Sequence, residues 1–459
     1  MKRLRDAQFL REALGRMWHF FIPILTTSAV SSAGILINSA VVGRHDREAL
    51  YAIGLYLPIY YVLLASQEAM RVASLAFSST LSEKRNTLAG YLGIILTASV
   101  LVPLGMLVVV LVARQSVFDA LHVAPAARHM VLVFMASMLT VGIMSSIANV
   151  LLSSLFGLGS GRIGSRVGVT STVLNVALTA LSVRLLHTGA MSLVYANAVV
   201  STLATAIALG LLMRIGVTPS LRLPGGLMRQ AVAEIARLSL PVAGSYLVIF
   251  SFLFVFDGIL GHFPQAGIAG FSVAYRVQTF AVLPAVALGI ATGIMINRSN
   301  GSGRGRDGQR IFLLGVVGSL TLYLPISVAI VLLREPLVAL FSNDLAVQAV
   351  ARDYMATVGP TYLVFGPLLT TMFVLEQLGL TLRVFAINLV SLSAEAAIAW
   401  WVQRNGGSLH DVFTVIAVIN GTALLWLAYE VVRRVLSINN VLPAVVHEGE
   451  GNPGSYDGR

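Results

Sequence analysis

The sequence predicts an all-α polytopic membrane protein in which twelve transmembrane helices form two six-helix lobes related by a pseudo-twofold axis. Three observations lead to this prediction. Apolar residues make up 57% of the 459 residues and charged residues only 11%, whereas a soluble domain carries about 25% charged residues. Apolar runs long enough to cross a bilayer recur along the chain, and the second half of the chain repeats features of the first.

This composition excludes several classes of protein. A mean hydropathy of +0.84 leaves too few charges to cover a water-exposed surface, so a soluble enzyme or a disordered chain is ruled out. The formal charge of +11 lies in short clusters between apolar runs, which indicates membrane topology and not a nucleic-acid partner. The chain has no cysteine, no HExxH, no P-loop and no GxSxG, so we expect no catalytic residues, no metal site and no bound cofactor.

The transmembrane helices are predicted from length. A hydrocarbon core about 30 Å thick needs about 20 apolar helical residues, and the runs here are too long and too continuous for barrel strands. Twelve segments qualify: 18–42, 49–77, 89–113, 128–152, 164–185, 190–213, 237–260, 266–296, 311–333, 351–376, 384–403 and 410–432.

The basic residues predict the orientation of these helices. With the N-terminus in the cytoplasm, 21 of the 31 Lys and Arg residues lie in inside segments and eight in outside loops, as the positive-inside rule requires. We therefore expect a multi-pass protein of the cell (inner or plasma) membrane with both termini in the cytoplasm. The expected parts are a basic amphipathic segment (1–17), a first lobe (18–213), a cytoplasmic linker (214–236), a second lobe (237–435) and a disordered cytoplasmic tail (436–459).

An internal repeat predicts the relation between the lobes. A shift of 218 residues places Pro23 on Pro241 and Gly43 on Gly261, without a gap across two helices. Because the shift spans an even number of helices, the two halves have the same orientation in the membrane. Transporters built from such parallel repeats bind cargo between the halves and rock them to alternate access. Two fused repeats also predict that a single chain, a monomer, is the transporting unit.

Several segments resemble a known family. The run Ile37–Gly43 with Glu48–Leu55 is similar to the first hairpin of the MATE (multidrug and toxic compound extrusion) transporters. Three further segments share this resemblance: Phe156–Arg162, Leu283–Gly301 and Leu340–Asp344. Together these segments extend the similarity over about residues 18–435. The resemblance implies a two-lobed antiporter that expels organic compounds in exchange for Na⁺ or H⁺.

The sequence departs from the family pattern in the first lobe. The acidic residue that the family commonly has near the outer end of the first helix corresponds to Asn38, which is an ion-coupling candidate by this alignment although its amide cannot carry a proton. The glycine expected after the second helix corresponds to Ser82, and the acid expected four residues after Asn175 corresponds to Thr179. These differences put the usual ion site of the first lobe in doubt.

Ionisable residues inside predicted spans are candidates for function, because charge at the bilayer centre costs at least ~2.5–3.5 kcal/mol. Glu395 lies about 18 Å deep, near the midplane. It is either a proton or cation site, or a neutral hydrogen-bonded acid or structural partner of an arginine. Arg276 lies about 15 Å down its helix and is either a counter-ion for an anionic cargo group or half of a buried ion pair. A contact between Glu395 and Arg276 is possible.

Two further acids have competing interpretations. Asp257 in the outer third of its helix corresponds under the repeat to a position next to Asn38. It is either the counterpart of the carboxylate missing from the first lobe or an acid facing an outward vestibule. Glu68 and Arg71 share a helical face near the inner boundary. They form either a self-compensating interfacial pair or a cytoplasmic latch between the lobes.

The remaining candidates are polar side chains and helix-end acids. Tyr60, Tyr61, Tyr275 and Gln278 either line a cavity or serve packing. Two acids at inner helix ends are expected to be solvated: Glu376 and Glu430.

We therefore predict secondary active efflux of a small organic substrate by cation antiport, with a weak preference for H⁺ because acids are too scattered to supply several oxygen ligands to Na⁺. The alternative is a lipid-linked oligosaccharide flippase of related fold, which would favour a basic cavity and often two further helices. A channel is less well supported, because no segment resembles a selectivity filter.

Overall fold

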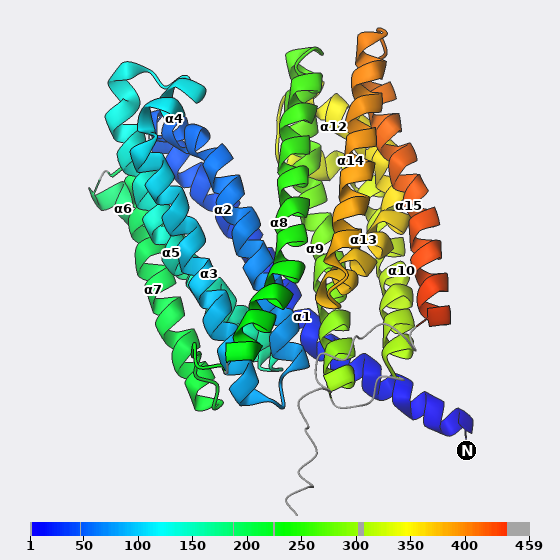
Figure 1. Ribbon diagram of the computed structural model, residues 1–459. Coiled ribbons are helices and arrows are strands. Elements are labelled where there is room, and N and C mark those ends of the chain that lie inside the picture. The colour runs from blue at the N-terminus through cyan, green and yellow to red at the C-terminus, as the bar shows by residue number, and fades with distance from the viewer. Residues whose placement is uncertain (1, 46, 187, 224, 302–306, 438–459) are drawn as a thin grey trace, which may run out of the picture.

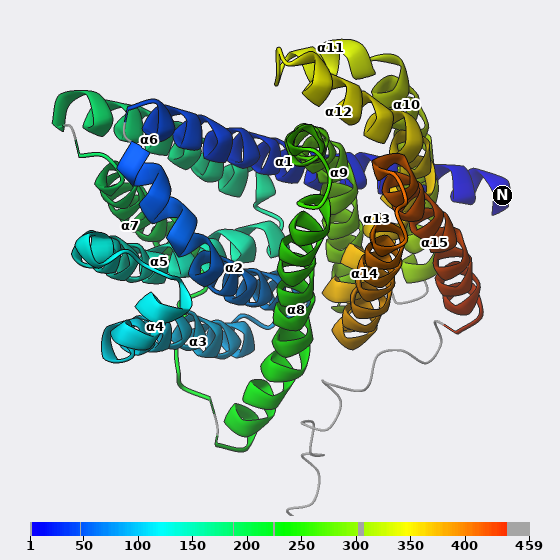
Figure 2. The ribbon, with the colours of Figure 1, turned by 90° about the horizontal axis from the view of Figure 1, so that it is seen from above.

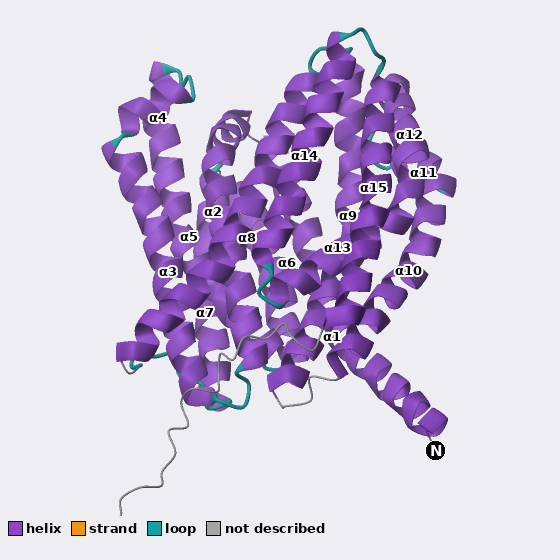
Figure 3. Ribbon diagram, turned by 45° about the vertical axis from the view of Figure 1, so that its right-hand side comes forward, coloured by secondary structure: helices purple, strands orange, loops and turns teal. Residues whose placement is uncertain are grey.

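The computed structural model is helical throughout the part of the chain that it describes, which comprises residues 2–45, 47–186, 188–223, 225–301 and 307–437 (Figure 3). Twelve helical segments among these residues are long and apolar enough to cross a membrane, as predicted from the sequence. The structure therefore confirms an all-α polytopic protein with twelve spans.

The first lobe consists of the helices up to residue 214. Its elements are α1 (Lys2–His45), α2 (Arg47–Thr80), α3 (Arg85–Val112), α4 (Arg114–Ala120), η1 (Pro125–Ala127), α5 (Arg128–Gly157), α6 (Gly161–Leu186) and α7 (Met191–Arg214). The short helix α4 and the turn η1 connect two spanning helices at the end of the bundle away from the N-terminus (Figure 1).

The second lobe follows the same order of long and short helices. Its elements are α8 (Gly225–Leu260), α9 (Gln265–Gly301), α10 (Gly308–Leu332), α11 (Arg334–Ala339), α12 (Leu345–Val358), η3 (Gly359–Thr361), α13 (Tyr362–Gln377), α14 (Thr381–Arg404) and α15 (Leu409–Ser437). The tenth span is thus broken into α12 and α13 by the turn η3, where Pro360 cannot donate a backbone hydrogen bond.

Helix α1 joins the two lobes. Its later turns pack along α6, while its first turns extend beneath the second lobe (Figure 2). There Ala13, Met17 and Phe20 are buried in one apolar cluster with Met295 of α9 and Ile311 of α10. The expected amphipathic segment 1–17 is therefore not a separate surface helix. It is continuous with the first span and part of the packing of the second lobe.

The lobes meet mainly where α2 packs on α8 and α9 and where α1 packs on α9, with smaller contacts of α3 with α8 and of α2 with α13. The helices lie close together at the end of the bundle where α1 begins and diverge towards the other end (Figure 1). In this region, the amide of Asn297 on α9 donates to the hydroxyl of Ser79 on α2 at 3.1 Å and to the carbonyl of Gln377 on α13 at 2.8 Å. We refer to this line of inter-lobe contacts as the seam.

The connection between the lobes is shorter than expected. Helix α7 ends at Arg214 and α8 begins at Gly225, so the second half of the predicted linker 214–236 is the first three turns of α8. Residues 231 and 235 of these turns are buried against α3, which explains why they are helical. Most of the predicted tail, residues 438–459, lies outside the described residues.

Close packing inside the second lobe depends on glycines of α9. A Cβ atom at Gly289 would lie 2.6 Å from both the backbone oxygen of Thr370 and the Cβ atom of Phe373 on α13. Small residues of this kind let helices approach closely within a membrane.

We predict that Gly289→Ala lowers the free energy of unfolding by about 1–3 kcal/mol, because the new methyl group would overlap backbone atoms of α13 that cannot move without distorting the helix. Gly210→Ala on α7 is the matched control, since no atom of the described residues outside its own helix turn lies within 4 Å of the position of its Cβ. Thermal unfolding in detergent measures both. Equal midpoints for the two variants would contradict the packing of α9 on α13.

Candidate functional site

A cavity of about 490 Å³ lies inside the first lobe, between α1, α2, α5, α6 and α7. Three amide side chains form a chain of hydrogen bonds across it. Asn38 of α1 donates to Asn175 of α6 at 2.7 Å, and Asn175 donates to Asn197 of α7 at 3.0 Å. These contacts join three helices of the lobe through polar groups that would otherwise be unsatisfied in the membrane.

This cavity carries no formal charge on the described residues that line it. Among the described residues, the oxygen of Asn38 in the cavity wall has no hydrogen-bond partner, and neither does the buried hydroxyl of Thr179 elsewhere on α6, the two positions where the resemblance implies acids. The cavity can accept polar or aromatic groups of a ligand through amides and hydroxyls. Asn38 itself, predicted as an ion-coupling candidate, has no proton to exchange.

The neighbouring tyrosines Tyr60 and Tyr61 face different surroundings. Tyr60 lines the cavity of the first lobe together with Tyr56. Tyr61 stacks on Phe250 of α8 with ring centroids 4.4 Å apart, so it belongs to the seam. Only Tyr60 of the predicted pair thus contributes to the cavity wall that the structure describes.

Glu395 of α14 is buried inside the second lobe, with 7% of the residue exposed. Its carboxylate acts electrostatically on Tyr354 of α12, whose hydroxyl donates to Gln278 of α9 at 2.6 Å. Tyr275, one turn before Gln278, lies within electrostatic range of the same tyrosine. The structure therefore brings three predicted residues, Glu395, Tyr275 and Gln278, together around Tyr354.

Arg276 does not belong to this group. Its side chain is exposed, and it forms no ion pair or hydrogen bond among the described residues. The expectation of a buried structural pair, including a contact with Glu395, is wrong. The helical periodicity explains the difference, because Tyr275, Val277 and Gln278 face the lobe, whereas Arg276 points away from it.

Asp257 of α8 is also exposed, although it lies in a spanning helix. Its carboxylate acts electrostatically on Tyr61 of α2 and on Tyr275 of α9. Asp257 thus lies at the edge of the seam, where groups from both lobes are nearby, and not in the interior of the second lobe.

Glu68 and Arg71 form the predicted ion pair on α2, with Nη2 of the arginine 2.6 Å from Oε2 of the glutamate. The hydroxyl of Tyr246 on α8 donates to the same oxygen at 3.4 Å, so the pair reaches across the seam. Glu376 of α13 is 4% exposed and Glu430 of α15 is 2% exposed. The expectation that these two acids are solvated is therefore wrong.

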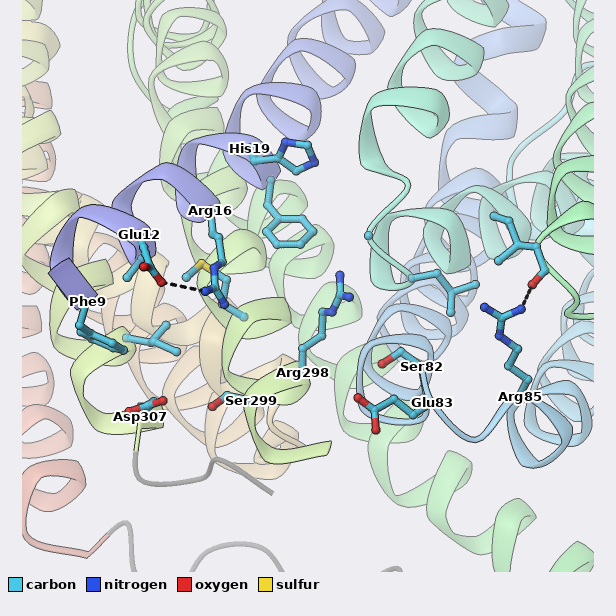
Figure 4. Close-up of a pocket in the computed structure, with 17 residues that line it drawn as sticks. Phe9, Glu12, Arg16, His19, Ser82, Glu83, Arg85, Arg298, Ser299 and Asp307 are labelled. Atoms are coloured by element: carbon cyan, nitrogen blue, oxygen red, sulfur yellow. Dashed lines mark hydrogen bonds and ion pairs between the residues drawn. The ribbon is translucent and has the colours of Figure 1, made fainter. Parts of the chain in front are cut away.

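A second cavity, of about 560 Å³, opens where α1 begins, and both lobes contribute to it (Figure 4). Three arginines and three acids line it. Arg16 pairs with Glu12 at 3.3 Å, Arg85 donates to the carbonyl of Ile215, and the guanidinium of Arg298 lies 5.9 Å from the ring centre of Phe20. Ser82, at the position where the family has glycine, also lines this cavity.

Four residues at these sites are not predicted from the sequence. Asn197, Tyr246, Tyr354 and Glu376 become candidates only because separate helices bring them next to Asn175, Glu68, Gln278 and Arg71. The sequence marks these residues only as polar side chains in apolar runs. Their depth along a helix does not show which residue of another helix they contact.

Comparison with known proteins supports the fold over more than nine-tenths of the chain. The MatE family model matches residues 241–401. A Vibrio cholerae MATE transporter, VcmN in a mutant form, is 18% identical with a TM-score of 0.86, and the alignment covers 94% of this chain and 99% of that one. An outward-facing multidrug resistance MATE family transporter of the MOP superfamily is 18% identical with a TM-score of 0.81 over 91% and 96%.

A MOP superfamily transporter from Pyrococcus furiosus, described as having a binding pocket of reversed polarity, is 16% identical with a TM-score of 0.81 over 91% and 96% of the two chains. A comparison with curated proteins finds no match. The chain is thus similar to the MatE family over residues 241–401, within the second lobe, and it has the fold of the solved MATE transporters over more than nine-tenths of its length.

Proposed function

We propose that the protein exports small organic compounds by secondary active antiport, with protons as the coupling cation. The observation that carries this proposal is the one-sided closure of the bundle, in which the lobes join at the end where α1 begins and diverge at the other. Alternating access needs two such arrangements around a shared pathway. The similarity to a transporter described as outward-facing supports assigning this arrangement to the outward-facing state.

The basic residues support placing the closed end in the cytoplasm. Most Lys and Arg residues lie in the connections at the end that holds the N-terminus, as expected for an inside surface. The closed arrangement is then outward-facing, and the protein lies in the cell (inner or plasma) membrane with both termini inside. Both lobes belong to one chain, so we expect the monomer to transport.

The acids of the second lobe favour proton coupling. Glu395 is buried and forms no hydrogen bond or ion pair among the described residues, so nothing there holds it as an anion. Such a carboxyl suits the loading and release of a proton. One elementary charge moving inward gains about 2.3 kcal/mol per 100 mV of membrane potential, which is enough to concentrate cargo many-fold.

The first-lobe cavity favours efflux of an organic compound over the flipping of a lipid-linked sugar. Amides, hydroxyls and the aromatic rings of Tyr56 and Tyr60 line it, whereas a pyrophosphate group would require basic residues. Cargo with aromatic rings and few charges fits such a lining.

We predict that reconstituted protein moves the fluorescent compound ethidium against its gradient when a pH gradient is imposed across the vesicle membrane, and not when a Na⁺ gradient alone is imposed. Ethidium fluorescence follows the movement, and protein-free vesicles give the background. Uptake driven by Na⁺ at equal pH on both sides would overturn proton coupling. The absence of any gradient-driven movement, for ethidium and for a panel of uncharged and anionic dyes, would overturn the proposed function.

We further predict that Glu395→Gln and Asp257→Asn each reduce gradient-driven export at least tenfold while protein levels stay unchanged, because each removes a carboxyl that can exchange protons. Glu335→Gln on α11 is the control, since that carboxyl is exposed and lies outside the spans. Initial rates in energised vesicles measure the effect. Export at the wild-type rate by both variants would remove these two acids from the coupling step.

A further inference from the structure

Four ionisable residues from three helices meet at the seam between the lobes. Glu68 and Arg71 belong to α2 of the first lobe, whereas Tyr246 belongs to α8 and Glu376 to α13 of the second. We call these four residues the seam cluster. None of the acids considered above as coupling candidates in the second lobe is part of it.

The contacts in the seam cluster centre on one arginine. Nε and Nη2 of Arg71 both lie 2.6 Å from Oε2 of Glu68, and the hydroxyl of Tyr246 contacts the same oxygen at 3.4 Å. Helix α13 packs on α2, and the carboxylate of Glu376 acts electrostatically on both Arg71 and Glu68. Arg71 is therefore shared between a carboxylate of its own helix and one from the opposite lobe.

The charges of this cluster do not balance when both acids are ionised. One guanidinium faces two carboxylates, so the cluster then carries one negative charge. Glu376 is 4% exposed, and its Oε2 atom has no hydrogen-bond partner among the described residues. A buried carboxylate without compensation is unfavourable, and the addition of one proton makes the cluster neutral.

Among the residues that the structure describes, Arg71 is the positive charge that acts on Glu376, and no cation of the other helices packed on α13 does so. Arg383 of α14 lies 3.9 Å from Glu430 of α15, so these two groups compensate each other. Helix α9 contributes the neutral Asn297, and α10 contributes Ser319, which bonds to Thr370 of α13. The electrostatic environment of Glu376 is accordingly set by Glu68 and Arg71.

We infer that the seam cluster is a proton-binding site that takes up one proton when the lobes close at the end where α1 begins and releases it when they part. In the closed arrangement the proton lies on the Glu68–Glu376 pair and leaves Arg71 balanced by a single carboxylate. When the lobes separate, Glu376 leaves Arg71 and becomes hydrated, so it no longer needs the proton. Because the two arrangements differ in affinity for the proton, pH shifts the equilibrium between them.

This inference rests on the proposed function only for the movement of the lobes, since it names no cargo. A single linked proton changes the ratio of closed to open molecules by at most about tenfold per pH unit. Rising pH removes the proton and opens this end, whereas falling pH closes it.

The test is a distance measurement between spin labels. The chain has no native cysteine, so Asn86→Cys at the start of α3 and Leu382→Cys at the start of α14 place one label on each lobe at the same end of the bundle. Both side chains are exposed. We expect a short distance at low pH and a growing population of longer distances as pH rises, measured by double electron–electron resonance in lipid nanodiscs without cargo.

Variants of the cluster assign the effect to these residues. Glu376→Gln leaves Glu68 and Arg71 balanced without a proton, so we expect the short distance at every pH. Glu68→Gln gives the same result through the remaining pair of Glu376 and Arg71, and it serves if the first variant does not fold. Glu430→Gln is the matched control, a buried acid with its own partner, and it should titrate as the wild type does.

Each outcome decides the inference. Distances that do not change with pH in the wild type, or variants of Glu376 and Glu68 that titrate like the wild type, would overturn it. Loss of titration in Glu430→Gln to the same extent would also overturn it. A protein that shows the expected titration but moves no dye in vesicles would contradict the proposed function and leave the proton site standing.

Discussion

The structure depends on one constraint, namely that a charge placed within the hydrocarbon of a membrane must be paired, neutralised or hydrated. Most spanning residues satisfy it by being apolar. Two buried or half-buried acids satisfy it with an arginine from the same protein, in the pairs Glu68–Arg71 and Glu430–Arg383. Glu395 is different, because it is buried and forms no ion pair among the described residues. The few acids that have no single arginine partner are therefore the ones that we propose to exchange protons.

The buried polar groups of the two lobes differ in charge. The first lobe holds a cavity whose polar contacts run through the amides of Asn38, Asn175 and Asn197, all neutral. The second lobe holds the buried acids Glu395 and Glu376. Under the proposed function, the neutral cavity would bind cargo of low charge and the buried acids would exchange protons, so binding and energy coupling need not share one site. The seam between the lobes then carries the connection, because groups of both lobes meet there.

The sequence predicts the fold well, since the length of an apolar run determines whether a helix can span the membrane, and the internal repeat indicates two lobes. It also singles out Asn38 as a candidate through its distance from Gly43, and the structure places this residue in the wall of the first-lobe cavity. The sequence wrongly predicts that Glu376 is solvated, because depth counted along one helix does not show which other helices surround the end of that helix. The prediction of a buried ion pair for Arg276 is wrong for a related reason. Depth along the helix can be counted from the sequence, whereas the direction of a side chain around the helix axis depends on packing. Asn197 needs the contact between α6 and α7 before its role is visible.

The central claim is that cargo and protons move in opposite directions through one two-lobed bundle, and reversal of the driving force tests it most directly. Vesicles loaded with ethidium, with equal pH on both sides and the potential clamped, supply only a cargo gradient. As the dye leaves through the protein, a pH-sensitive dye trapped inside should report acidification, and protein-free vesicles should report none. Downhill movement of ethidium at constant internal pH would contradict the account, since exchange requires that each flow drive the other.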